Sequence, residues 1–329
     1  MSDATYAADG AATPDRLANF PISFFATVMG LSGVALATLR LEHVAGAPHV
    51  ASAGVLVVAA AVFVVVAALY LLKLRRHPAE VRAEWRHPVK IAFFPTISIS
   101  LVLLGTAAQA FLPALGVGLW AVGSVAHLVA TLAIVSMWIN GEHYEAPHLN
   151  PAWFIPAVGN VLVPLVGARY GYVEVSWLFL SIGLMFWIVL LTIVFNRLIF
   201  HHPMPPHLLP TLCILIAPPA VAFLAYDSLA GTLDGFARLL YYPAVVFFLL
   251  VALQMPRLLA LPFALSWWAY SFPLAALTVA TFVMAERTGL VVFTVGAIGL
   301  YALLVVVVGW LAVRTVVAIR NHGICKPHL

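Results

Sequence analysis

Charged residues are scarce in this sequence of 329 residues. Only 9% of the residues are Asp, Glu, Lys or Arg, whereas 64% are hydrophobic and the mean hydropathy is +1.06. A water-soluble domain carries about a quarter of charged residues and could not hide this much apolar side chain. The composition excludes an ordinary soluble fold and predicts an integral membrane protein.

The sequence also lacks the patterns that mark enzymes. It has no glycine-rich phosphate loop, no nucleophile placed beside a base and no nucleic-acid-binding element, and its two cysteines, Cys213 and Cys325, predict no disulfide. Five histidines in two connections have neither cysteine partners nor regular ligand spacing, which favours an interfacial position over a metal site. These are His143, His148, His201, His202 and His207. We therefore expect no catalytic residue, no metal, no cofactor and no nucleic-acid partner; a membrane enzyme that used these histidines would need a cofactor that the sequence does not indicate.

Long uncharged runs divide the chain into ten predicted spans. A span needs about 20 apolar residues to cross the hydrocarbon layer, and helices are expected because the alternating pattern of barrel strands is missing. The predicted spans cover residues 21–39, 51–72, 91–112, 115–139, 153–168, 175–195, 208–226, 239–255, 263–285 and 289–313. We expect one membrane domain over residues 19–318 between short tails at 1–18 and 319–329. The first tail has no positive segment of the kind that precedes a cleaved signal.

The basic residues predict the orientation of the ten spans. Twelve of the 16 Lys and Arg residues fall on the side that holds both tails, half of them between Lys73 and Lys90, and four fall on the other side. Positive loops stay in the cytoplasm. Both tails are therefore expected in the cytoplasm. We also expect the protein to lie in the inner, or plasma, membrane of a bacterium, with lipid around it.

Proline sorts the predicted spans into two kinds. Eight prolines lie within spans, and seven of these lie in odd-numbered ones; only Pro243 departs from the rule. An internal proline removes a backbone hydrogen bond, and the freed carbonyl needs a partner or a wet cavity. We expect five helical hairpins whose kinked, odd-numbered members surround a path, although proline is also commoner in all membrane helices. The predicted kinks include Gly30, Pro95, Pro156, Pro218 and Pro273.

The predicted path has no acidic residue at membrane depth. All 12 Asp and Glu residues fall in tails, loops or span ends. The one titratable candidate at depth is His127, near Ser124 and Thr131 in an even span, where an interhelical hydrogen bond explains it without transport. A lumen without carboxylates suits an anion, which backbone N–H groups, hydroxyls and a positive mouth would then attract. Candidate polar residues along odd spans are Ser98, Ser100, Asn160, Ser271 and Thr278, although each alone is also typical of packing.

Several segments resemble one known family. FPISFFATVMGLSGVALA from Phe20, HPAEVRAEWRHPVKIAFFPTISIS from His77, HLNPAWFIPAVGNVLVP from His148, IAPPAVAFLAY from Ile216 and WWAYSFPLAALTVAT from Trp267 are similar to the TehA and slow-type anion channel family. This family is also called the tellurite-resistance and dicarboxylate transporter family. The resemblance covers residues 20–320. It implies a homotrimer in which each subunit has ten helices, arranged as five hairpins in a quasi-five-fold ring around its own pore.

The resemblance also implies a gate. In that family a phenylalanine of the ninth helix plugs the pore, and the matching position in WWAYSFPLA is Phe272. Because Phe272 precedes Pro273, its backbone is expected to depart from regular helix, and its ring would close a narrow uncharged lumen by volume and dewetting. The other reading of Phe272 is a core residue.

The sequence leaves two transport functions open. The first is a channel for small anions such as chloride and nitrate, gated by the aromatic plug. The alternative is a carrier for C4-dicarboxylates such as malate, or for oxyanions such as tellurite, which could be coupled to protons.

Overall fold

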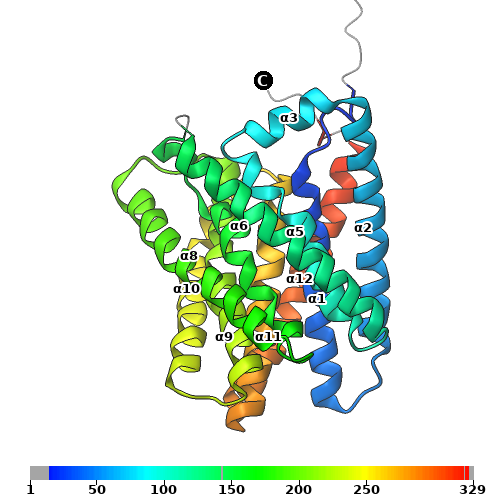
Figure 1. The fold of residues 1–329 in the computed structure, drawn as a ribbon, viewed down its shortest axis with the longest axis vertical. Helices are drawn as coiled ribbons and strands as arrows, with labels where there is room; N and C mark the ends of the chain where they lie inside the picture. The colour runs from blue at the N-terminus through cyan, green and yellow to red at the C-terminus, as the bar shows by residue number, and fades with distance from the viewer. Residues whose placement is uncertain (1–14, 142–143, 322, 326–329) are drawn as a thin grey trace, which may run out of the picture.

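A computed structural model describes residues 15–141, 144–321 and 323–325, and every regular element in these residues is helical (Figure 1). Nine of the helices in this part of the chain are long and apolar enough to cross a membrane. The predicted all-α membrane fold is confirmed at this level. The first 14 residues and the last four lie outside the described residues, and so does most of the predicted tail at 1–18.

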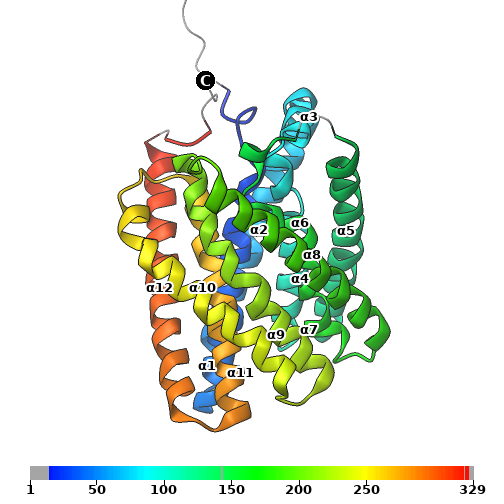
Figure 2. The same cartoon turned by 90° about the vertical axis from the view of Figure 1, so that its left-hand side faces the viewer.

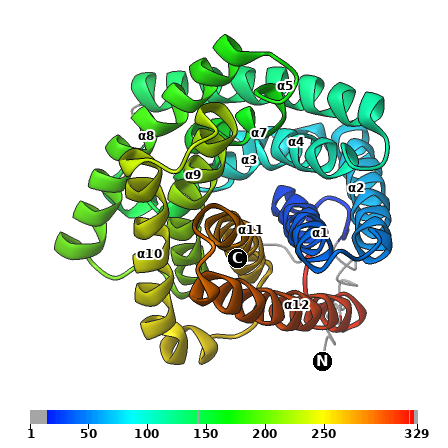
Figure 3. The ribbon, with the colours of Figure 1, turned by 90° about the horizontal axis from the view of Figure 1, so that it is seen from below.

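Five long α-helices form the outside of the bundle. They have 25 to 30 residues each, so at a rise of about 1.5 Å per residue they reach roughly 37 to 45 Å. They are α2 (Val50–Arg76), α5 (Pro113–Asn140), α8 (Val173–Phe200), α10 (Gly235–Leu259) and α12 (Val291–Arg320). Only 17% to 28% of their most apolar windows is buried, and Figure 3 shows them surrounding the other helices. Their exposed Leu, Val and Ile side chains form large apolar surfaces of the kind that marks a membrane or protein contact.

Four further spans lie inside this layer, with 72% to 94% of their apolar windows buried. Each begins with a 3₁₀ turn and continues as an α-helix. They are η1 (Ile22–Phe24) with α1 (Phe25–Ala45), η2 (Lys90–Phe93) with α4 (Thr96–Ala108), η6 (Pro206–Ile216) with α9 (Ala217–Ala230), and η7 (Leu265–Tyr270) with α11 (Ser271–Thr288). The predicted contrast between interrupted and continuous spans is present, and it extends to α10, which stays helical through Pro243.

The fifth predicted span is shorter and more broken than expected. Within residues 151–167 the chain forms η4 (Pro151–Trp153), α6 (Phe154–Val158), η5 (Gly159–Leu162) and α7 (Pro164–Gly167), and it counts as a shorter apolar segment. Prolines 151, 156 and 164 each remove one backbone donor, so no long ladder of hydrogen bonds can form here. Of the ten predicted spans, nine have the length of a span in the described part of the chain and the fifth is a shorter apolar segment.

Consecutive inner and outer segments pack as antiparallel hairpins, seen from the side in Figure 2. The turns between them are tight because α1, α9 and α11 end at Gly46, Gly231 and Gly289, whose φ angles of 64°, 68° and 66° favour glycine. The inner segments also touch one another: α1 contacts α4 and α11, α9 contacts α7 and α11, and η5 contacts α4 and α9. Every inner segment therefore has an inner neighbour on both sides.

A buried ion pair closes the end of the molecule that holds the chain termini. Lys73, in the last turn of α2, lies 3.0 Å from the carboxylate of Glu84 in the short helix α3 (Pro78–Arg86). The Lys73 side chain is 1% exposed and also donates to the carbonyl of Phe20 at 2.8 Å, and the Tyr70 hydroxyl donates to Glu84 at 2.8 Å. Helix α3 and the segment that leads into α1 are thus tied to the same point.

Candidate anion pathway

Two cavities lie among the inner helices on opposite sides of one aromatic side chain. The wide cavity, of about 480 Å³, opens toward the turns that join α1 to α2 and α4 to α5. The narrow cavity, of about 70 Å³, lies among the 3₁₀ starts of the inner spans. Three side chains line both cavities: Phe272 from α11, Leu162 from η5 and Val221 from α9. They form an apolar collar between the two spaces.

Phe272 is held in place by the close approach of α1. A Cβ built on Gly33 would lie 3.6 Å from Phe272 Cδ2 and 2.7 Å from Ala275 Cβ, and one on Gly30 would collide with the Ser271 hydroxyl. Two glycines three residues apart on α1 thus let the first turn of α11 lie against it. Gly30, a predicted kink, lies inside the uninterrupted helix α1, where the structure uses it for this close contact.

The backbone of Phe272 does not depart from helix, contrary to our expectation. Phe272 is the second residue of α11 and Pro273 is the third. A proline in the first turn is tolerated because the N–H groups there have no intrahelical acceptor. The backbone changes from 3₁₀ to α-helix just before Phe272, where η7 ends at Tyr270.

The predicted proline kinks lie close to such changes. Pro95 immediately precedes α4, Pro218 is the second residue of α9, and Pro156 is in the middle of the short helix α6. Pro218 and Pro273 also line the narrow cavity. Pro95 and Pro156 are not among the described residues that line either cavity.

The narrow cavity is almost entirely apolar. Its hydroxyl groups come from Ser23, Thr96 and Ser266, and among the described residues that line it there is no charged side chain and no histidine. Met29, Phe93 and Trp268 supply much of its wall. An ion that loses water here gains little in exchange, so this half of the path opposes ion entry in the described conformation.

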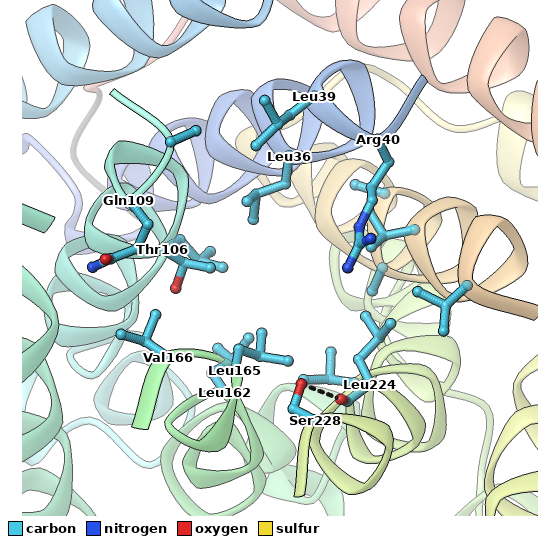
Figure 4. A pocket seen from close by; sticks show the side chains of 18 of the residues that line it. Leu36, Leu39, Arg40, Thr106, Gln109, Leu162, Leu165, Val166, Leu224 and Ser228 are labelled. Atoms are coloured by element: carbon cyan, nitrogen blue, oxygen red, sulfur yellow. Dashed lines mark hydrogen bonds between the residues drawn. The ribbon is translucent and has the colours of Figure 1, made fainter. Parts of the chain in front are cut away.

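The wide cavity carries the charges. Arg40, Arg169, Asp227, His43 and His49 all line it. Figure 4 shows Arg40 reaching into the space from α1, across from Leu162 and Leu165. Asp227, which the sequence places at a span end, lies in the last turn of α9 and lines the cavity at this mouth.

Asp227 is neutralised by a basic neighbour. Arg287 donates to its two carboxylate oxygens at 2.7 and 3.1 Å. A forked pair of this kind holds the carboxylate against the guanidinium and removes most of its repulsion for a passing anion.

The five predicted polar residues are buried, and the described lining of the two cavities does not include them. The hydroxyls of Ser98, Ser100, Ser271 and Thr278 donate to backbone carbonyls three or four residues earlier, at 2.6 to 2.8 Å. The amide of Asn160 donates to the carbonyl of Ala157 at 2.8 Å and to Thr131 Oγ1 at 2.9 Å. In this conformation these groups donate hydrogen bonds to protein atoms and not to an ion in the path.

His127 has the interhelical partner expected from the sequence. Its Nδ1 lies 3.0 Å from the hydroxyl of Ser98 on α4, and its Nε2 faces Gly159 so closely that a Cβ there would lie 2.7 Å away. On the same helix α5, Thr131 donates to the carbonyl of Pro156 at 2.6 Å. These contacts stabilise the interrupted fifth segment, residues 151–167, from the side that does not face the path.

Among the described residues no group of three or more His, Cys, Asp or Glu side chains could hold a metal ion. His143 lies outside the described residues.

Sequence reasoning missed Arg40, Gln109 and Arg169 as lining residues. Each lies at the end of an inner segment, where the sequence predicted a positive mouth but no particular residue for it. Arg40 lies seven residues beyond Gly33 on α1, which is two helical turns on the same face. The sequence offered only this helical spacing as a signal, because the contact of Gly33 with Phe272 is seen in the structure alone.

Comparison with known proteins places the chain in a family. Residues 19–316 match the family described as SLAC1, voltage-dependent anion channel. The chain is 28% identical over 309 residues to the S-type anion channel SLAH3 of Arabidopsis thaliana, a match that covers 92% of this chain and 48% of the plant protein. It is 29% identical over 261 residues to the tellurite resistance protein TehA homolog of Haemophilus influenzae, covering 78% of this chain and 79% of that protein.

A third relative is archaeal. The uncharacterized transporter MJ0762 of Methanocaldococcus jannaschii is 26% identical over 311 residues, covering 87% of this chain and 91% of that protein. The chain spans about half the length of the plant S-type anion channels SLAH3 and SLAH2 that it matches. The predicted resemblance is confirmed, and this integral membrane protein belongs to the SLAC1 and TehA family of anion channels and transporters.

Proposed function

We propose that this protein is a channel that conducts small anions, such as chloride and nitrate, through the centre of each subunit. The observation that carries the proposal is the position of Phe272 between a wide and a narrow cavity that both lie among the inner helices. Membership of a family that contains S-type anion channels supports the ion type. Among the described residues that line the two cavities Asp227 is the one acid, and it is paired with Arg287 at the mouth.

The architecture that we infer for this function is a quasi-five-fold ring of five hairpins, with the interrupted segments inside. Support comes from the contacts of each inner segment with inner neighbours on both sides and from its greater burial. The extensive apolar surface of α2, α5 and α12 is compatible with lipid and with a homotrimer, which the family resemblance implies. The basic segment at the end of α2 supports a cytoplasmic position for both chain ends in the inner membrane of a bacterium.

The gate would be the whole collar, with Phe272 as its largest member. Because Leu162 and Val221 also line both cavities, removing the ring of Phe272 would widen the collar without removing it. In an apolar constriction, water and ions are excluded once the opening is narrow, so a larger opening should conduct.

The test is the anion current of F272A in planar bilayers or oocytes. The proposal predicts a current well above that of the wild type. F200A provides the matched control, because Phe200 is 74% exposed at the end of α8 and its loss should leave the current unchanged. An F272A protein that is folded, yet carries the wild-type current, would refute the gate.

The companion variants L162A and V221A test the collar. Each should raise the current above the wild type, and the double variants with F272A should conduct more than F272A alone. If L162A and V221A leave the current unchanged, both alone and combined with F272A, Phe272 alone closes the path.

A further inference from the structure

Arg40 is a charged hydrogen-bond donor that lines the wide cavity. Its guanidinium enters the space from α1, and its Nη1 lies 3.4 Å from Glu286 Oε2, which is long for a charge-assisted hydrogen bond. The two side chains are 40% and 36% exposed, so water weakens this ion pair further. The guanidinium therefore keeps donors for another partner.

Two hydroxyls that line the same cavity cannot take that role in the described geometry, whereas the amide nitrogen of Gln109, which has no hydrogen-bond partner among the described residues, can also donate. The hydroxyls of Thr106 and Ser228 donate to the carbonyls of Val102 and Leu224 at 2.7 and 2.8 Å, as Figure 4 shows for Ser228. Each hydroxyl has one proton, so it can only accept from a ligand in the cavity. An anion needs donors, and these groups would offer it none.

The charge around Arg40 favours an anion. Asp227 already holds Arg287, and Arg169, which also lines the cavity, has no ion pair among the residues that the structure describes. His43 and His49 are further cationic groups when protonated, and His49 Nδ1 lies 3.6 Å from Glu42 Oε2. Glu286 is the one acid paired with Arg40 within the described part of the chain.

The position of Arg40 relative to the gate is fixed by one helix. Gly33 lies beside Phe272, and Arg40 follows seven residues later on uninterrupted α1, which is about 10 Å along the axis. An ion bound at Arg40 would lie in the wide cavity, about two helical turns from the collar.

We propose that Arg40 forms an anion-binding station at this mouth and that the station prefers small planar oxyanions, such as nitrate or a monocarboxylate, over spherical chloride. The guanidinium is a planar fork whose parallel N–H groups match two oxygens of a planar anion, whereas a halide uses only the charge. This inference rests on the proposed channel function and adds a selectivity residue to it.

The experiment uses the full-length protein carrying F272A, so that the gate does not limit the current. Conductance is measured against nitrate and against chloride concentration at one fixed pH, because His43 and His49 share the cavity. R40Q should raise the nitrate concentration for half-maximal conductance about fivefold, the effect expected from removing one unit charge about 4 Å from an anion in water. The maximal conductance at high nitrate should change much less.

Two further variants separate charge from shape. R40K keeps the positive charge but lacks the planar fork of N–H groups. Its dependence of conductance on chloride concentration should therefore match that of F272A alone, whereas its preference for nitrate over chloride should stay reduced. E286Q releases Arg40 and should lower the half-maximal nitrate concentration. Thermal unfolding of each purified variant shows that it is folded.

The outcomes are distinct. If R40Q and R40K both keep the nitrate curve and the nitrate-to-chloride ratio, the station is refuted while the channel stands. If R40K restores nitrate as fully as chloride, the charge is confirmed and the planar preference is refuted. If F272A carries no anion at all, the proposed function itself fails.

Discussion

The buried pair of Lys73 and Glu84 should be worth several kcal/mol to the fold. Its charges lie 3.0 Å apart, with side-chain exposures of 1% and 8%. At an effective dielectric constant of about 20, two unit charges at this distance attract by about 5 kcal/mol, which is offset in part by their desolvation. Breaking a buried pair by removing one partner typically costs about 3 to 5 kcal/mol, because the other charge stays buried.

The perturbation is K73M, which replaces the side chain by an unbranched apolar one that is a single heavy atom shorter and has no ammonium. The carboxylate of Glu84 would then retain the Tyr70 hydroxyl as its one hydrogen-bond donor among the described residues. The free energy of unfolding should fall by about 3 to 5 kcal/mol. The double variant K73M/E84Q should lose less than the sum of the two single variants, because it leaves no uncompensated charge.

The assay is unfolding of purified protein in mixed detergent, followed by tryptophan fluorescence. R76M is the control, since Arg76 is exposed on the same turn of α2 and its loss should change the free energy by less than about 0.5 kcal/mol. If K73M costs less than about 1 kcal/mol, or if the two substitutions are additive, the pair does not hold α3 and the start of α1 as described.

Two other predictions concern stability. G30A should lower the free energy of unfolding by about 1 to 3 kcal/mol, because its Cβ would collide with the buried Ser271 hydroxyl; an unfolding curve equal to the wild type would show that α1 and α11 can separate freely. D234A should lower the melting temperature at neutral pH, because the hydrogen bonds from the Tyr226 hydroxyl and from the backbone N–H of Ala237 hold the pKa of Asp234 below its ordinary value of 3.8. The ionised carboxylate favours the folded state, so this contribution is present above pH 3.8 and is lost as the pH falls through the lower folded value; melting curves of D234A and the wild type should therefore converge in acid.

The membrane fold could be predicted from the sequence because lipid leaves few alternatives. Runs of apolar residues had to be helices, and prolines had to mark the segments whose backbone is interrupted. The fifth segment differed because three prolines within 17 residues prevent any long helix, which hydropathy alone does not register.

The lining of the path was harder to predict. A hydroxyl in an apolar span can face the path or its own backbone, and the sequence does not distinguish the two. In Ser98, Ser271 and Thr278 the hydroxyl is turned to a backbone carbonyl. The cavities are instead lined by apolar side chains, with charge at one mouth, where Arg40 lies in the last turns of α1.

The most direct test of the central claim is anion flux through liposomes in which the purified F272A protein is the only protein. Chloride, nitrate and malate are offered in turn, with a membrane voltage set by potassium and valinomycin, with and without a proton gradient. The account predicts rapid voltage-driven flux of chloride and nitrate that does not change with the proton gradient. Accumulation of malate or another anion against its own gradient, driven by protons, would contradict the channel and identify a coupled carrier.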